Sequence, residues 1–265
     1  MNSKINLEIP DEINGLPIEM GIGISGIDAV VGPVVFVAAF AKVGYQWNTV
    51  SCNDQINPDQ RVLELNNIKS LPIGFGFISY SAAEISASLY NSNDINSLTQ
   101  SAIKSLAKAI SAKGLFINTL QMVMSDGDME KFRENLQKEF QFMRVVCVKK
   151  ESSRLNSIRV ASFYADIIRN QELSNFEFAE PETSIDRCYG SGYSDDSETI
   201  DWLNRNFDPI FGFPSIVRFH SKPAQEALKQ NQVKVTFRND ENVKTQNIID
   251  SAFFSQRKAQ SPALQ

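Results

Sequence analysis

The chain has 265 residues, of which 42% are hydrophobic and 22% are charged, so it is an ordinary globular protein with room for one large α/β domain and a small appendage. Its formal net charge of -5 and its pI of about 5.1 exclude a global positive field that would attract a phosphate backbone. Any contact with nucleic acid must therefore be local.

The first twenty residues are charged and have no long apolar stretch. This composition predicts neither a secretory signal nor a membrane anchor, so we expect an intracellular protein. We divide the chain into an N-terminal extension at 1–19, a main domain at 20–230 and a C-terminal extension at 231–265.

The first elements follow from apolar runs and turn residues. Residues 20–40 form a long apolar run that Gly32-Pro33 interrupts, which predicts two buried strands joined by a tight bend. Turn residues before Pro58 predict a helix over about 59–69, because proline is favoured in the first helical turn. A third strand is expected at 73–80.

In the middle of the chain, apolar residues at three- and four-residue spacing predict a helix at 94–113 with one apolar face. Strands and helices then alternate, and we expect them at 120–124 (strand), 130–142 (helix), 143–148 (strand) and 154–172 (helix). This alternation implies a sheet with helices packed on it. The tail beyond residue 231 is interpreted as a segment that packs on the body or on a partner.

The last third holds the most informative motifs. Residues 188–193 read Cys-Tyr-Gly-Ser-Gly-Tyr, a glycine loop, which is followed by Trp-Leu at 202–203 and by a turn-rich aromatic run at 209–219. With the segments 30–35 and 96–98, these ordered pieces closely resemble the catalytic subunit of eukaryotic type-2 ribonuclease H.

The resemblance covers roughly residues 21–228. It implies an α/β fold, a ribonuclease H-like mixed sheet with helices packed on it, plus a C-terminal helical appendage. Members of this family hydrolyse the RNA strand of RNA–DNA hybrids with four carboxylates that hold two divalent metal ions. The resemblance also implies a nuclear protein that works in a complex with accessory protein subunits.

The family's four metal ligands have no acidic counterpart in an ungapped alignment. The Asp-Glu pair of the family's first strand falls on Gly23 and Ile24, the third ligand on Met124 and the fourth on Ser152. Because Mg²⁺ requires hard oxygen ligands, this pattern predicts that the chain has no metal site and no cofactor.

Part of the family's substrate-binding set remains. Gly26 stands where the family has a glycine of its ribonucleotide-binding loop, and Tyr193 where it has a tyrosine beside the RNA–DNA junction, but the arginine of that loop is replaced by Ile27. We therefore predict a catalytically inactive pseudoenzyme that serves as a structural or interaction subunit of a larger protein complex.

Two alternatives stay open. Small gaps would move Asp28, Asp126 and Glu151 towards the ligand positions, and a two-residue shift keeps a strand side chain on the same face. The chain would then be an active endoribonuclease on RNA–DNA hybrids that uses Mg²⁺ or Mn²⁺. The other alternative is a hybrid binder that does not cleave, with Tyr193 and the basic residues of 149–159 as its contacts.

Three further motifs favour structural roles. The glycine pattern at 21–26 resembles a dinucleotide-binding loop, but strand-forming residues follow it instead of a helix. His220 is the only histidine, and alone it cannot supply a metal cluster. Residues 246–254 are similar to a sliding-clamp motif with the spacing off by one, and we expect them to dock on the body of the protein or on a partner.

Overall fold

A computed structural model of the chain describes residues 4–47, 58–90, 94–124, 129–149, 155–178, 185–231 and 233. The strands are β1 (Asn6–Glu8), β2 (Pro17–Ser25), β3 (Val34–Lys42), β4 (Gly74–Tyr80), β5 (Phe116–Val123) and β6 (Arg144–Val148). The helices are α1 (Pro58–Lys69), α2 (Ala82–Tyr90), α3 (Ile95–Ser111), α4 (Met129–Glu139), α5 (Asn156–Ser174), α6 (Ser197–Arg205) and α7 (Lys222–Asn231), with a 3-10 turn η1 (Asp11–Ile13).

The strands form one mixed sheet in the order β1-β4-β3-β2-β5-β6. The pairs β1–β4, β4–β3 and β3–β2 are antiparallel, whereas β2–β5 and β5–β6 are parallel. The two pieces of the predicted apolar run are β2 and β3, but the loop 26–33 joins them in place of the predicted tight bend, and Gly32-Pro33 lies at its end. Eight consecutive buried residues in β3 require cover on both faces of the sheet.

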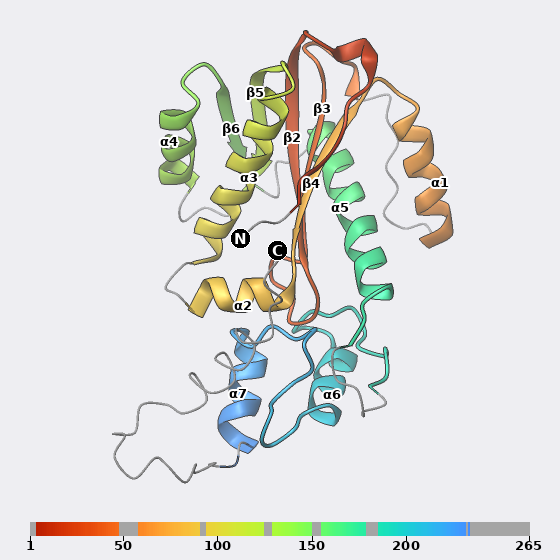
Figure 1. Ribbon diagram of the computed structural model, residues 1–265, viewed down its shortest axis with the longest axis vertical. Helices are drawn as coiled ribbons and strands as arrows, with labels where there is room; N and C mark the ends of the chain where they lie inside the picture. The colour runs from red at the N-terminus through yellow and green to blue at the C-terminus, as the bar shows by residue number, and fades with distance from the viewer. Residues whose placement is uncertain are drawn as a thin grey trace, which may run out of the picture.

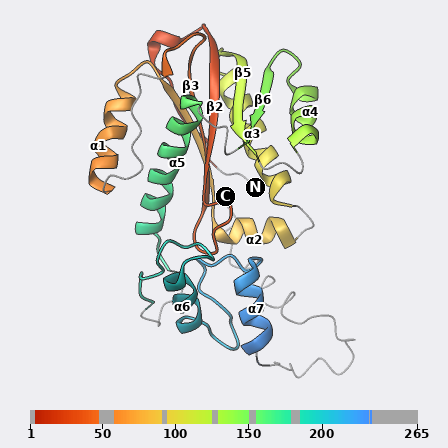
Figure 2. The same cartoon turned by 180° about the vertical axis from the view of Figure 1, so that it is seen from behind.

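Helices supply that cover on the two sides. One core cluster joins Ile22 and Phe36 of the sheet to α3 and α4, and a second joins Val35 and Val37 to α1 and α5. Figures 1 and 2 show the same division, with α3 and α4 on one side of the sheet and α1 and α5 on the other. None of the described helices is both long and apolar enough to cross a membrane.

The segment 185–231, with α6 and α7, lies below the sheet in Figure 1 and has its own apolar cluster around the fully buried Trp202. Two isolated pairings, Ala29 with Tyr193 and Val31 with Val217, tie this segment to the loop between β2 and β3. That loop is therefore the junction between the sheet and the C-terminal part of the described chain.

The elements that sequence patterns did not reveal include β1, α2, α7 and η1. β1 lies within the predicted N-terminal extension but pairs with β4, so part of that extension belongs to the sheet. Its three residues are too few to show an alternating pattern, and α2 is a nine-residue helix rich in small residues. The predicted C-terminal extension lies outside the described residues, apart from its first residue and Val233.

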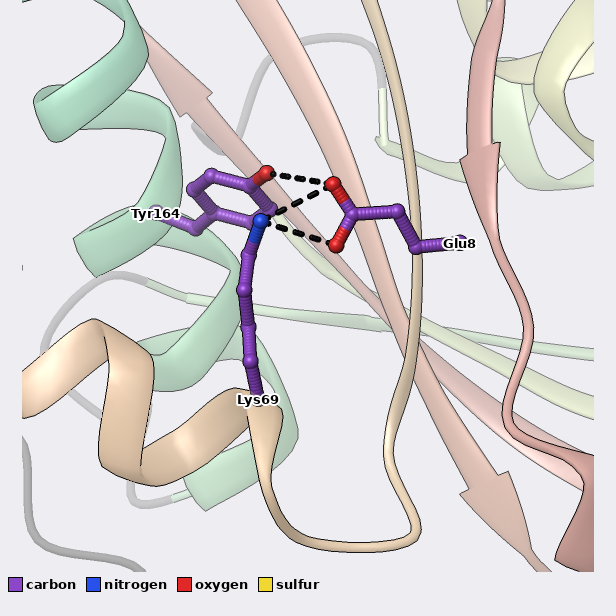
Figure 3. Close-up of polar contacts among 3 residues, drawn as sticks. All are labelled: Glu8, Lys69 and Tyr164. Atoms are coloured by element: carbon purple, nitrogen blue, oxygen red, sulfur yellow. Dashed lines mark hydrogen bonds and ion pairs between the residues drawn. The ribbon is translucent and has the colours of Figure 1, made fainter.

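A polar cluster fastens β1 and α1 to α5 (Figure 3). Lys69 Nζ lies 2.8 Å from the Glu8 carboxylate and 4.7 Å from the centre of the Tyr164 ring, and Tyr164 Oη donates to Glu8 at 3.3 Å. Burial lowers the pKa of Lys69, but its hydrogen bonds to Glu8 and Tyr164 outweigh burial and raise that pKa overall. Because the pair is partly exposed, its stabilisation is about 0.2–1 kcal/mol.

Candidate functional site

The candidate site lies where β2 ends against α5. Side chains of a strand alternate between its two faces, so Gly21, Gly23 and Ser25 face α5, whereas Ile22 and Ile24 face α3. A Cβ added at Gly21 would lie 2.5 Å from Ser157 C of α5. The helix backbone thus rests directly on the strand.

This contact is closest at Gly23, the first of the four predicted ligand positions. A Cβ at this position would lie 2.6 Å from Ser162 Cα and closer still to Ser162 N and Ala161 C. Ordinary van der Waals contact begins at 3.4 Å, and the atoms in the way belong to a helix backbone, which cannot turn aside as a flexible side chain can. No side chain fits at position 23 unless α5 moves.

The next two predicted ligand positions lie on the opposite face of the sheet. Ile24 and Met124 are half-buried and pack against the apolar cluster formed with α3 and α4. Met124 directly follows β5, and its N–H donates to the carbonyl of Val148 at 3.0 Å. The structure therefore does not bring these positions together with position 23 around one point. The fourth position, Ser152, lies outside the described residues.

The proposed surrogate acids are not assembled in the described part of the chain. Asp28 is exposed in the loop after β2, and Asp126 and Glu151 lie outside the described residues. Among the residues that the structure describes, no three His, Cys, Asp or Glu side chains are grouped so that they could hold a metal ion.

One acid that sequence reasoning did not select does lie at this site. Asp166 of α5 accepts a hydrogen bond of 2.5 Å from the hydroxyl of Ser25, which is 3% exposed at the end of β2. The sequence does hold a signal for Asp166, because it is the one acid in the apolar stretch 160–168 of a helix that is buried along most of its length. A buried hydroxyl needs a hydrogen-bond acceptor, and Asp166 supplies one to Ser25. The pair is therefore explained without a bound metal ion or substrate.

The structure brings the two predicted substrate-binding remnants together. The N–H of Gly26 donates to Tyr193 Oη at 3.2 Å, and the guanidinium carbon of Arg169 lies 5.0 Å from the centre of the Tyr193 ring. Gly26 has φ +79°, and a Cβ there would lie 2.5 Å from the carbonyl oxygen of Pro33, so glycine is required at this turn.

Two buried arginines hold the loop that carries Gly26. Arg169 Nη2 donates to the carbonyl of Val31 at 3.1 Å, and Arg218 Nε donates to the carbonyl of Gly32 at 2.8 Å. Arg218 is fully buried, and burial, with the nearby charge of Arg169, lowers its pKa to about 9. No sequence pattern singles out Arg169, and Arg218 is visible in the sequence only as one residue of the aromatic run at 209–219.

The only histidine lies next to these groups but takes no metal-binding role. His220 is half-buried, and burial together with the charge of Arg218 lowers its pKa to about 4, so the ring is neutral at pH 7. Within the described ranges, its Nδ1 is a buried atom without a hydrogen-bond partner. That His220 takes no part in a metal site therefore stays a prediction.

In a comparison across protein families, the model for ribonuclease HII matches residues 20–224. The chain belongs to the ribonuclease HII family. This match begins within β2, spans the other strands except β1 and reaches into α7.

Individual members of the ribonuclease HII family are distant relatives in sequence. A ribonuclease H2 subunit from Arabidopsis thaliana is 29% identical over 238 residues, which cover 87% of this chain and 80% of that protein. The corresponding protein of Schizosaccharomyces pombe is 26% identical over 273 residues, covering 96% and 80%. These values place the chain well inside the family but far from any one of these relatives.

Solved structures confirm the predicted fold. Ribonuclease H2 from Pyrococcus horikoshii OT3 matches with a TM-score of 0.65 and 19% identity, covering 80% of this chain and 98% of that one. Ribonuclease HII of Archaeoglobus fulgidus, in a structure of its complex with PCNA, matches with a TM-score of 0.64 and 18% identity, covering 82% and 98%. At these identities the likeness concerns the ribonuclease H-like fold alone.

Proposed function

We propose that this member of the ribonuclease HII family does not cleave nucleic acid and serves as a structural or interaction subunit of a larger protein complex. The observation that carries the proposal is the contact of α5 with Gly23. A carboxylate at the first ligand position needs a Cβ, and the backbone of Ser162 occupies that space. The helix thereby fills the place from which the first ligand would reach a metal ion.

The surroundings of the other positions support the same conclusion. Ile24 and Met124 contribute to an apolar cluster, where an unpaired carboxylate would be costly. Clustered carboxylates without metal also repel one another, and their replacement by neutral groups removes that repulsion. The loss of the ligands is therefore consistent with a gain in stability of the fold.

The partners that we propose come from the relatives. The Arabidopsis and fission yeast proteins are named as subunits, so we propose that this chain also occupies a multi-protein assembly, in the nucleus by the same likeness. No metal cofactor is required for such a role.

Two measurements on the purified chain test the proposal. Calorimetric titration with Mg²⁺ and Mn²⁺ should give no binding in the millimolar range, and a duplex with a single ribonucleotide should remain intact in Mn²⁺. An active ribonuclease HII serves as the positive control for the same duplex. Cleavage that co-purifies with the chain and disappears in a variant of one acid would overturn the proposal.

The acid at α5 supports a second candidate, an active endoribonuclease with a rebuilt site. In it Asp166 would join Asp28, Asp126 and Glu151 as oxygen ligands for Mg²⁺ or Mn²⁺. This candidate requires that Mn²⁺-dependent cleavage is lost in Asp126→Asn and in Asp166→Asn. The exposed Glu12→Gln, at a distance from the loop, is the matched control and should retain full activity.

The retained pairing of Gly26 with Tyr193 supports a third candidate, a binder of RNA–DNA hybrids that does not cleave them. Binding should weaken as salt rises, because contacts to phosphate release counterions. Tyr193→Ala should reduce it by about 1–3 kcal/mol if a base or sugar stacks on the ring. Hybrid affinity that is equal in the variant and the unmodified chain excludes this role for Tyr193.

A further inference from the structure

One edge of the sheet is open in the described part of the chain. β6 is the last strand of the sheet order, and with α4 it forms one margin of the molecule in Figures 1 and 2. The opposite edge consists of β1, which has only three residues. A free strand edge presents unpaired backbone groups that can bind a further strand.

The hydrogen bonds of β6 show which residues face outward. Val148 accepts from the N–H of Met124, so its polar backbone groups face β5. Because backbone groups alternate along a parallel strand, those of Val145 and Cys147 face away from the sheet. The Val145 N–H donates to Gln137 Oε1 at 3.4 Å, whereas the described residues supply no partner outside the sheet for the N–H or C=O of Cys147.

A groove runs along this edge. It has a volume of about 480 Å³ and lies between α4, from Met129 to Gln137, and β6, from Arg144 to Cys147. Burial raises the pKa of the Cys147 thiol, which is therefore neutral and adds a small apolar surface. Val146 is half-buried and lies on the sheet face opposite to Cys147.

The charges at the groove favour one kind of occupant. On α4, Arg133 is paired with Glu130 one turn earlier. Arg144, at the start of β6, is exposed and has no ion pair with any described residue. A strand that paired with β6 would therefore meet a positive charge that no described residue pairs at one end, and valine side chains along its length.

We propose that the β6 edge binds an extended segment of a partner protein as an additional strand. The segment would carry alternating apolar residues, which pack beside Val146 and Val148, and an acidic residue beside Arg144. The backbone groups of Cys147 provide the pairing. This inference rests on the proposed interaction role. Its test measures peptide binding alone, whereas the proposed function is tested by metal binding and cleavage, so the two proposals can fail separately.

A synthetic peptide tests the proposal on the full chain. In the probe, valine alternates with threonine and one threonine is replaced by glutamate; fluorescence anisotropy measures its binding. The matched control is the same peptide with N-methyl groups on the pairing edge, which removes the backbone hydrogen bonds but keeps the side chains. We expect saturable binding of the first peptide and an affinity at least about tenfold lower for the second.

A charge exchange then locates the site. The Arg144→Glu variant should bind the glutamate peptide with about tenfold lower affinity and should bind instead a version of the peptide in which lysine replaces glutamate. Arg205→Glu makes the same charge change on exposed α6, far from β6, and should leave binding unchanged. Equal binding of the N-methylated peptide, or no saturable binding at about 1 mM peptide, overturns the proposal. It is also overturned if the unmodified chain is a dimer that Arg144→Glu dissociates, because the occupant is then a second copy.

Discussion

The contact between Gly23 and α5 leads to a quantitative prediction for Gly23→Ala. The added methyl group would lie 2.6 Å from Ser162 Cα and closer to two further backbone atoms, far inside the 3.4–4 Å of ordinary contact. Overpacking of a buried site costs about 1–3 kcal/mol when side chains can adjust. Here the neighbours are backbone atoms of a helix that packs on β2 and is buried along most of its length, so we expect a loss of at least ~3 kcal/mol in the free energy of unfolding.

The backbone of Gly23 makes this variant informative. Unlike several other glycines of the chain, Gly23 does not have a positive φ angle, so alanine can adopt the same backbone conformation without strain. Reduced entropy of the unfolded chain would by itself stabilise alanine by about 0.4–1 kcal/mol. A large loss of stability must therefore come from the contact with α5.

Urea unfolding followed by circular dichroism measures the effect, with Gly76→Ala as the control. A Cβ at Gly76 would meet the end of the flexible Leu7 side chain at 2.7 Å, so this variant should lose less than about 1 kcal/mol. If Gly23→Ala unfolds at the same urea concentration as the unmodified chain, α5 leaves space at position 23, and the main argument against a metal ligand there fails.

Three further predictions concern the groups around the loop after β2. Asp166→Ala leaves the buried Ser25 hydroxyl without its acceptor and should cost about 1–3 kcal/mol; a double variant with Ser25→Ala should recover part of this loss, and strictly additive losses would argue against the bond. Arg218→Gln removes the charge that holds the carbonyls of Gly32 and Ile27 and should cost about 3 kcal/mol or more by urea unfolding, so an unchanged midpoint contradicts that role. His220 has a folded pKa of about 4 and an unfolded value of 6.5, so the unfolded state binds the proton more readily: stability should be complete above pH 6.5 and decline as the pH falls towards 4. His220→Gln should flatten this decline, and an equal slope in both proteins would exclude His220 as its source.

Periodicity and turn residues determined most of the fold. The apolar run at 20–40, interrupted by Gly32-Pro33 and rich in β-branched residues, favours two buried strands, because a strand covered on both faces is apolar throughout. Asp94 lies before a helical pattern and accepts a hydrogen bond from the N–H of Ser97, as expected of a helix cap. These signals are local, so no tertiary contact is needed to interpret them.

The amino-acid sequence by itself also led to the prediction that the family's ligand positions fall on Gly23, Ile24, Met124 and Ser152, because residue identity decides which atoms can bind a metal ion. Only the tertiary structure decided that α5 rests on Gly23, that Asp166 reaches Ser25, and that Arg169 joins Tyr193. These contacts join residues far apart in the chain, and they depend on the distance between a helix and a strand, which no local pattern encodes.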